Sequence, residues 1–129
     1  LSLAVIDVDD FKKLNDSLGH LAGDRALVHL QTVMQAALRP TDVVARIGGE
    51  EFAILFSSTD IDDATAATER VQSELAERAF EHDGASRIIS FSGGVTRWSA
   101  GEALEAALQR ADDAMYRAKR AGKNRVERA

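Results

Sequence analysis

The segment that decides the fold is DVVARIGGEEFAILF, residues 42–56. It consists of two strand-like apolar runs, DVVARI and EFAILF, with Gly48 and Gly49 between them. Two such runs around a short glycine turn are typical of an antiparallel hairpin. One or two turn residues would be enough to reverse the chain. Because Glu50 and Glu51 follow the glycines directly, the sequence predicts a hairpin tip at which carboxylates serve some purpose besides the turn.

Hydrophobic periodicity outside the hairpin predicts alternating strands and helices. Residues 1–7, LSLAVID, form a near-continuous apolar run, which is typical of a strand buried on both faces. Apolar residues at helical spacing, together with further strand-like runs, account for the rest of the chain. The predicted helices span residues 24–39, 61–79 and 103–118, and the further predicted strands span residues 86–98 and 124–128.

Glycine and proline mark the boundaries of these elements. Residues 19–24, GHLAGD, are turn-like and lead into the first predicted helix, which Pro40 ends. Gly122 has the usual position of glycine after the last helix. Gly93 and Gly94 lie inside a predicted strand, where glycine indicates either a bulge or the close approach of another backbone.

The predicted order is strand, helix, strand, strand, helix, strand, helix, strand, with the hairpin in the middle. This order predicts a ferredoxin-like α+β sandwich with an antiparallel central sheet. A chain of 129 residues without a repeat or linker fits one domain, residues 1–129. Because it starts abruptly with an apolar strand, we expect this domain to come from a longer protein, in which a sensor or membrane domain would precede it.

An acidic cluster, Asp7, Asp9 and Asp10, ends the first predicted strand. In a ferredoxin-like sheet this strand runs antiparallel beside the third, so its end should lie near Glu50 and Glu51 at the hairpin tip. Two carboxylates ~4 Å apart repel by about 4 kcal/mol at an effective dielectric of 20, so such a cluster needs a cation or raised pKa values. Mg²⁺ suits it, because this ion takes hard oxygen ligands and completes its shell with water and phosphate. Taken alone, the acidic residues are better explained as ordinary solvated turn residues, because short acidic motifs often match by chance.

A basic segment, residues 117–128 (RAKRAGKNRVER), closes the chain with six Arg or Lys and one Glu. Cations late in a helix also complement the helix dipole, at ~0.3–1 kcal/mol each, so a structural explanation suffices for this segment by itself. The combination of the two clusters favours a nucleoside triphosphate as ligand, since its charge must be met both by a metal and by basic side chains.

Composition and motif searches disfavour other classes of protein. A net charge of −5 and an aromatic content of 5% argue against a nucleic-acid partner. Cysteine is absent, which excludes a disulfide framework and fits a reducing compartment. There is no signal-peptide pattern, and no apolar run approaches the ~18 residues of a membrane span. GxxxxGK[ST], GxGxxG, HExxH and a Ser-His-Asp pattern are missing as well, so P-loop, dinucleotide-binding and hydrolase interpretations lose ground.

Three ordered blocks of this sequence resemble the diguanylate cyclase family, which is named after its GGDEF hairpin. GGEEF, residues 48–52, is the accepted variant of that signature. DVDDFKKLNDSLGHLAGD, residues 7–24, is similar to the family's D-x-D-x-F-K-x-x-N-D-x-x-G-H-x-x-G-D block at every fixed position, and residues 110–126 resemble its closing segment. The usual lead-in with L-T-x-L-x-N-R is missing. Asp10 and Lys123 depart from the pattern, because many members have an aromatic residue and Arg at these positions.

The resemblance implies a metal site and a guanine site. Asp7, the Val8 carbonyl and Glu50 would hold divalent metals, Mg²⁺ or Mn²⁺. Asn15 and Asp24 would bind the guanine edge by hydrogen bonds, since a carboxylate can accept from both N–H groups of guanine.

The resemblance also implies how the rest of the nucleotide is bound. The backbone amides of Phe11 and Lys12 would lie along the triphosphate, with Lys119 and Lys123 on the terminal phosphates. The hairpin glycines, Gly48 and Gly49, would let the nucleotide approach without a Cβ in the way. Glu51 would assist deprotonation of the ribose 3′-hydroxyl or bind a second metal.

The implied reaction condenses two GTP molecules into cyclic di-GMP and two pyrophosphates. Each domain would carry one GTP, so the active species would be a homodimer in the cytoplasm. Arg39 and Asp42 match the RxxD site through which product inhibits these enzymes, and Arg70 matches a helper arginine. The alternative is a catalytically silent module that binds GTP or cyclic di-GMP to regulate a neighbouring domain, although such modules usually have a damaged signature.

Overall fold

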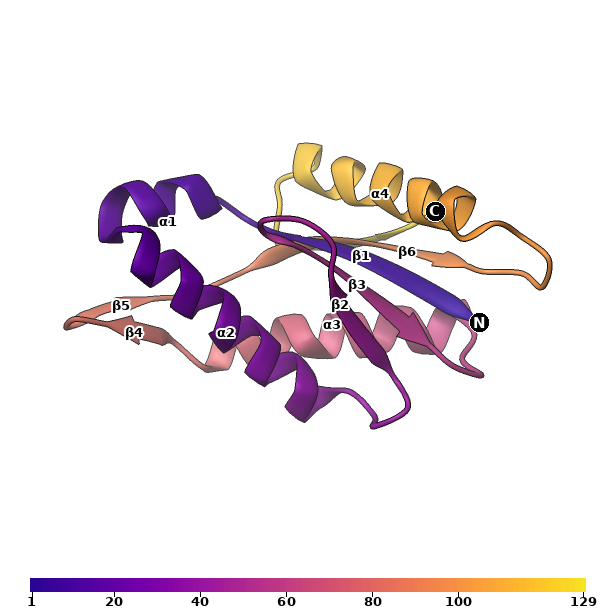
Figure 1. The fold of residues 1–129 in the computed structure, drawn as a ribbon, viewed down its shortest axis with the longest axis horizontal. Coiled ribbons are helices and arrows are strands. Elements are labelled where there is room, and N and C mark those ends of the chain that lie inside the picture. The colour runs from indigo at the N-terminus through magenta and orange to yellow at the C-terminus, as the bar shows by residue number, and fades with distance from the viewer.

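The computed structural model describes residues 1–129 as an α+β domain built around a five-stranded sheet (Figure 1). The strand order in this sheet is β2-β3-β1-β6-β7, and a separate two-stranded sheet pairs β4 with β5. The strands are β1 (Ser2–Val8), β2 (Val43–Arg46), β3 (Glu51–Phe56), β4 (Phe80–His82), β5 (Ala85–Arg87), β6 (Phe91–Arg97) and β7 (Val126–Arg128). The helices are α1 (Phe11–Leu18), α2 (His20–Ala37), α3 (Ile61–Glu77) and α4 (Leu104–Arg120).

The predicted hairpin and its neighbour are confirmed. Strands β2 and β3 pair antiparallel around the glycine tip, and β1 pairs antiparallel with β3, so that Asp7 lies directly across from Glu51. Strand β6 pairs antiparallel with the other edge of β1. The ferredoxin-like core therefore consists of β1-α2-β2-β3-α3-β6, and the end of β1 lies beside the hairpin tip as expected.

Helices cover both faces of the sheet (Figure 1). The main core lies between the sheet and helices α2 and α3, where alternate residues of β1 meet the apolar stripes of both helices. Helix α4 covers the opposite face, and here Val5 packs with Ala111 and Met115. None of the helices combines the length and apolar composition that a membrane span requires.

Helix α4 lies directly on the backbone of β6 at Gly94. A Cβ at this position would come within 1.9 Å of the Ala111 carbonyl oxygen and 2.5 Å of the Met115 backbone nitrogen. Of the two predictions for the glycine pair, the close backbone approach is confirmed, and the regular register of β6 with β1 leaves no bulge.

The structure corrects several predicted boundaries. Residues 19–24 are not a turn, because α2 already begins at His20 and only Gly19, with φ of +94°, separates it from the unpredicted helix α1. The predicted strand over residues 86–98 is two strands, of which β5 belongs to an unpredicted hairpin with β4. The sheet is mixed rather than wholly antiparallel, since β7 returns through α4 and pairs parallel with β6.

Candidate functional site

The carboxylates predicted to converge do so at the end of β1. The Val8 backbone N–H donates to the Glu50 carbonyl oxygen (3.1 Å), which joins β1 to the hairpin tip one residue beyond the Asp7–Glu51 pair. Asp112 on α4 lies near enough to raise the pKa of Glu51. The sheet register and one helix therefore bring acidic groups from three parts of the sequence together.

The pKa values of three acids in this cluster are raised, first by burial and then by the neighbouring acids. Burial, and after it the charge of Asp7, raises the pKa of Glu50. Burial raises the pKa of Glu51 too, with Asp7, Asp112 and Glu50 adding to the shift. The pKa of Asp112 is raised by burial, by Asp113 and by Asp7. Burial and the neighbouring carboxylates therefore disfavour the charged forms of the two glutamates at the hairpin tip.

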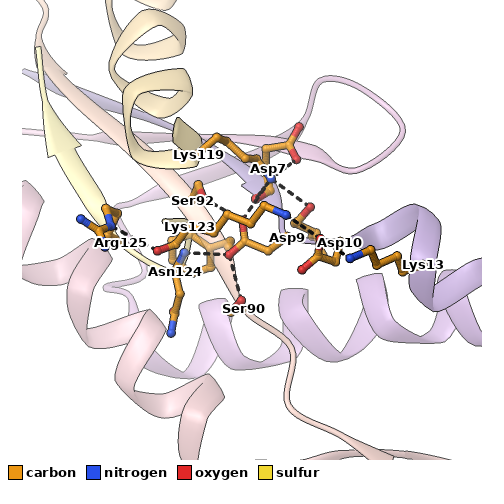
Figure 2. Close-up of polar contacts among 12 residues, drawn as sticks. Asp7, Asp9, Asp10, Lys13, Ser90, Ser92, Lys119, Lys123, Asn124 and Arg125 are labelled. Carbon is orange, nitrogen blue, oxygen red and sulfur yellow. Dashed lines mark hydrogen bonds and ion pairs between the residues drawn. The ribbon is translucent and has the colours of Figure 1, made fainter. Parts of the chain in front are cut away.

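Lys119, in the last turn of α4, is the cation that this cluster contains. Its Nζ lies 2.8 Å from Asp7 Oδ1 and 3.0 Å from Asp9 Oδ1 (Figure 2). It also donates to the Val8 carbonyl oxygen at 3.2 Å. Burial alone would lower the pKa of Lys119, but the hydrogen bonds to Asp7 and Asp9 outweigh it, and the pKa is raised. The ammonium group is therefore held in its charged form.

The oxygen atoms around Lys119 Nζ suit a divalent cation. They are carboxylate and carbonyl oxygens, the hard ligands that Mg²⁺ and Mn²⁺ prefer. A cation, the ammonium group itself, already lies on Asp7 Oδ1 and the Val8 carbonyl. No three His, Cys, Asp or Glu side chains form a metal cage by themselves. Mg²⁺ usually takes only one or two carboxylates and draws its other ligands from water and phosphate, so the donor set fits this ion.

The N-terminus of α1 lies directly after this cluster. Asp10 precedes the helix in a left-handed conformation (φ +53°), and its side chain makes no capping hydrogen bond. The first backbone N–H groups of a helix have no partner within the helix, and uncapped they suit an anion. Phe11 and Lys12 carry these N–H groups, while the Phe11 ring packs against the core and the Lys12 side chain is exposed.

The contact between α1 and α2 contains a buried acceptor without a partner. Asn15 Oδ1 is buried and makes no hydrogen bond. It lies where a Cβ of Gly23 would be, since an added Cβ would come within 1.8 Å of Asn15 Oδ1 and 3.1 Å of the Phe11 ring. Asp24 follows Gly23 in the chain and is exposed. The structure therefore places Asn15 beside the turn of α2 that carries Asp24.

The hairpin tip is exposed, and Arg46 stabilises it by hydrogen bonds to its backbone. Arg46 donates from Nε to the Gly48 carbonyl (3.1 Å) and from a terminal nitrogen to the Gly49 carbonyl (2.7 Å). Neither glycine has a positive φ, and a Cβ on Gly49 would meet nothing within 4 Å. Nothing inside this domain therefore requires glycine at position 49.

Lys123 forms an ion pair with Asp10 at the surface. Its Nζ lies 2.6 Å from Asp10 Oδ1, and this hydrogen bond lowers the pKa of Asp10 (Figure 2). Both residues have left-handed backbones, with φ of +53° at Asp10 and +65° at Lys123. These are the two positions that depart from the family pattern, and the structure shows that the departures contact each other.

The residues predicted to form a regulatory site also lie together, away from the hairpin tip. Arg39 donates through its backbone N–H to Asp42 Oδ2 (2.9 Å) and through its guanidinium group to Asp42 Oδ1 (3.4 Å). Arg70 on α3 donates to the carbonyl of Ala37. The three predicted side chains line a hollow of about 250 Å³ whose other walls include Thr59.

Three residues near the site carry no predicted role. Asp9 belongs to the acidic cluster and to the D-x-D motif. Asp112 lies in the closing block, and Arg46 begins the stretch before the glycines. Their contacts depend on how α4 and the hairpin fold back on β1, which the local sequence pattern does not reveal.

The comparisons with known proteins agree with the resemblance seen in the sequence. A family profile described as "Diguanylate cyclase, GGDEF domain" matches residues 1–125. The diguanylate cyclase DgcP of Pseudomonas aeruginosa is 43% identical over 127 residues, which are 98% of this chain and 19% of that protein. The chain thus spans about a fifth of the length of DgcP.

Solved structures of GGDEF domains match the fold closely. Diguanylate cyclase SiaD of Pseudomonas aeruginosa, in complex with its activator SiaC, has a TM-score of 0.95 at 38% identity, covering 99% of this chain and 49% of that chain. The GGDEF domain of DgcB from Caulobacter crescentus, in complex with c-di-GMP, has a TM-score of 0.92 at 33% identity, covering 98% and 76%. The fold is that of a GGDEF domain. The chain belongs to the diguanylate cyclase GGDEF domain family.

Proposed function

We propose that this domain is a diguanylate cyclase that condenses two GTP molecules into cyclic di-GMP and two pyrophosphates. The observation that carries the proposal is the position of Asn15. Its unpaired, buried Oδ1 lies on the same short helix as the uncapped N-terminus, which in turn follows the oxygen cluster at the end of β1. A base, a phosphate chain and a metal could thus bind in one continuous row.

Guanine is the base that these groups suit. Guanine has N–H donors on its Watson–Crick edge, and Asn15 Oδ1 is an acceptor in need of a donor. The carboxylate of Asp24 adds acceptors in the neighbouring turn of α2. Adenine presents no such pair of donors, so the two residues would favour GTP over ATP.

The triphosphate would lie between α1 and the basic end of α4. The N–H groups of Phe11 and Lys12 point out of the uncapped helix start, and Lys119 and Lys123 lie nearby at the end of β1. Asp7, the Val8 carbonyl and Glu50 would hold Mg²⁺ or Mn²⁺, which supplies Lewis-acid stabilisation of charge at the transferring phosphoryl group. The exposed Gly48 and Gly49 would admit the nucleotide close to the hairpin backbone.

The reaction joins the 3′-oxygen of each GTP to the α-phosphorus of the other, while the bond from that phosphorus to pyrophosphate breaks. Each hairpin carries one nucleotide, so two domains must meet face to face as a homodimer. Glu51 is the acceptor proposed for the proton of the 3′-hydroxyl. Its raised pKa, caused by burial and by the neighbouring acids, supports this role. Because GTP is an intracellular metabolite, the proposed location is the cytoplasm.

Product binding at a second site is part of the same proposal. The hollow away from the hairpin tip is lined by Arg39, Asp42 and Arg70, so two guanidinium groups border it. Arginine suits phosphate and guanine recognition, because its planar group donates two parallel hydrogen bonds. Cyclic di-GMP bound there would favour a non-productive arrangement of the two domains, which is a shift in population. The variant Arg70→Ala should weaken inhibition by added product without lowering the initial rate.

A turnover experiment tests the proposal. The protein is fused to a dimerising coiled coil, incubated with GTP and Mg²⁺, and analysed for cyclic di-GMP by chromatography. The matched control is Glu50→Gln, which keeps the side-chain shape and removes the charge. Product from the native dimer and none from the control would support the cyclase. GTP binding without turnover would instead favour the silent regulatory module, and neither binding nor turnover would refute both.

A further inference from the structure

Asp9 has the most completely bonded carboxylate near the hairpin. Only 3% of its side chain is exposed. Its Oδ1 accepts from Ser92 Oγ at 2.6 Å and from Lys119 Nζ at 3.0 Å, and its Oδ2 accepts from Ser90 Oγ at 2.8 Å and from the Asn124 N–H at 2.9 Å (Figure 2). A carboxylate offers about four acceptor sites, so these four donors leave none for a metal.

The contacts of Asp9 join separate parts of the fold. They link the end of β1 to β6 through Ser92, to the last turn of α4 through Lys119, and to the turn before β7 through Asn124. Asn124 has a left-handed backbone (φ +47°), which its N–H bond to Asp9 helps to hold. Three of the four contacts do not involve Lys119, so Asp9 stays in place when the ammonium group moves.

Lys119 occupies oxygens that the proposed metal would use. Its Nζ lies 2.8 Å from Asp7 Oδ1 and 3.2 Å from the Val8 carbonyl oxygen. Mg²⁺ would bind the same oxygens at about 2.0–2.1 Å. Two cations cannot share them at this distance without strong repulsion, so the metal and the ammonium group compete for Asp7 and Val8. Asp9, which has no free acceptor for the metal, is the partner that the ammonium group keeps.

We propose that Lys119 is a tethered counter-ion that fills the metal position of the free domain, and that Asp9 is the positioning residue that holds it there. When nucleotide and metal arrive together, the ammonium group leaves Asp7 and Val8, remains on Asp9, and turns to the phosphates. The free domain therefore binds a bare metal ion weakly, and binds the metal with its nucleotide well. This inference rests on the proposed metal site.

Metal affinity in the absence of nucleotide tests the competition. Mn²⁺ binding is measured by electron paramagnetic resonance for the native protein, for Lys119→Met and for Lys123→Met. Because Lys119→Met lacks the competing charge, it should bind Mn²⁺ on the order of tenfold more tightly than the native protein does. Lys123→Met removes an equal charge, but Lys123 Nζ lies on Asp10, so its effect should stay below about threefold. Affinity of Lys119→Met no higher than that of Lys123→Met would overturn the inference.

A double-mutant cycle tests the role of Asp9. With Mg²⁺ and a non-reactive GTP analogue, Asp9→Asn should weaken nucleotide binding about tenfold in the native background and less than about twofold in the Lys119→Met background. A residue that only supported the fold would weaken binding equally in both. Ser90→Ala removes a hydrogen bond of Asp9 on the side away from Lys119, and should leave nucleotide affinity nearly unchanged.

The native protein separates the two possible failures. If it binds the GTP analogue and Mn²⁺ but the variants follow neither pattern, only the counter-ion inference is wrong. If it binds neither ligand, the proposed function fails and the inference falls with it. Thermal unfolding of each variant identifies any loss of binding that is due to loss of the fold.

Discussion

The variant Gly23→Ala should separate nucleotide affinity from stability. The new Cβ would come within 1.8 Å of Asn15 Oδ1 and 2.8 Å of Asn15 Cγ, so the side chain of Asn15 must rotate away. Since Asn15 Oδ1 has no hydrogen bond to lose, this rotation costs little in the free protein. In a helix interior, alanine stabilises the folded state by about 1 kcal/mol relative to glycine. Overpacking of the new Cβ beside Phe11 would destabilise it by about 1–3 kcal/mol.

The free energy of unfolding should therefore change by less than about 2 kcal/mol. Loss of a buried hydrogen bond to guanine costs about 1–3 kcal/mol, so affinity for a non-reactive GTP analogue should fall roughly 5- to 150-fold. The assays are denaturant unfolding and isothermal titration calorimetry. The double variant Gly23→Ala/Asn15→Ala should bind no more weakly than Asn15→Ala alone. Unchanged GTP affinity in Gly23→Ala and Asn15→Ala alike would refute the reasoning.

Four further variants address the metal site, the sheet and the hairpin tip. Asp7→Asn should reduce metal-dependent GTP binding at least tenfold. The unfolding free energy should change less, because Lys119 keeps its ion pair with Asp9. If calorimetry gave the variant the same metal affinity as the native protein, the carboxylates would not share an ion. Gly94→Ala should destabilise the protein by about 3 kcal/mol or more in urea unfolding, because its Cβ would meet backbone atoms of α4. The control Gly49→Ala should have almost no effect on stability, because its Cβ would meet nothing within 4 Å. Because the pKa of Glu51 is raised in the folded state, protonated Glu51 favours folding at low pH, and this contribution is lost as pH rises through the raised pKa. Glu51→Gln should therefore be more stable than the native protein at neutral pH. Equal stability of the two proteins from acid to neutral pH would contradict this.

The sequence was sufficient for the core of the fold and for where the acidic groups meet. Strong apolar runs and a glycine turn predicted the hairpin, and the known strand order of the fold class then put Asp7 beside Glu51, as the register confirms. It failed where an element is short or its pattern weak. Helix α1 has eight residues, and Gly23, which reads as a turn residue, is in fact the point where α2 makes room for Asn15.

The hairpin of β4 and β5 has a turn signal in the sequence but no strand signal. Asp83-Gly84 is a strong turn pair, and both residues have positive φ, as a tight hairpin turn of this kind requires. The strands on either side have only three residues each, so periodicity could not reveal them. The partners of Lys119 and Lys123 were also beyond reach, because they depend on long-range contacts of α4 and the last turn with β1.

The bare contact at Gly94 limits how Lys119 can travel. At Gly94 no side chain separates the backbones of β6 and α4, so a shift or tilt of α4 would bring the two backbones into steric clash. An excursion of the ammonium group must then come from rotation about the lysine's own bonds. Rotation of this kind moves one side chain only, so exchange of the ammonium group between carboxylate and phosphate requires no rearrangement of the domain.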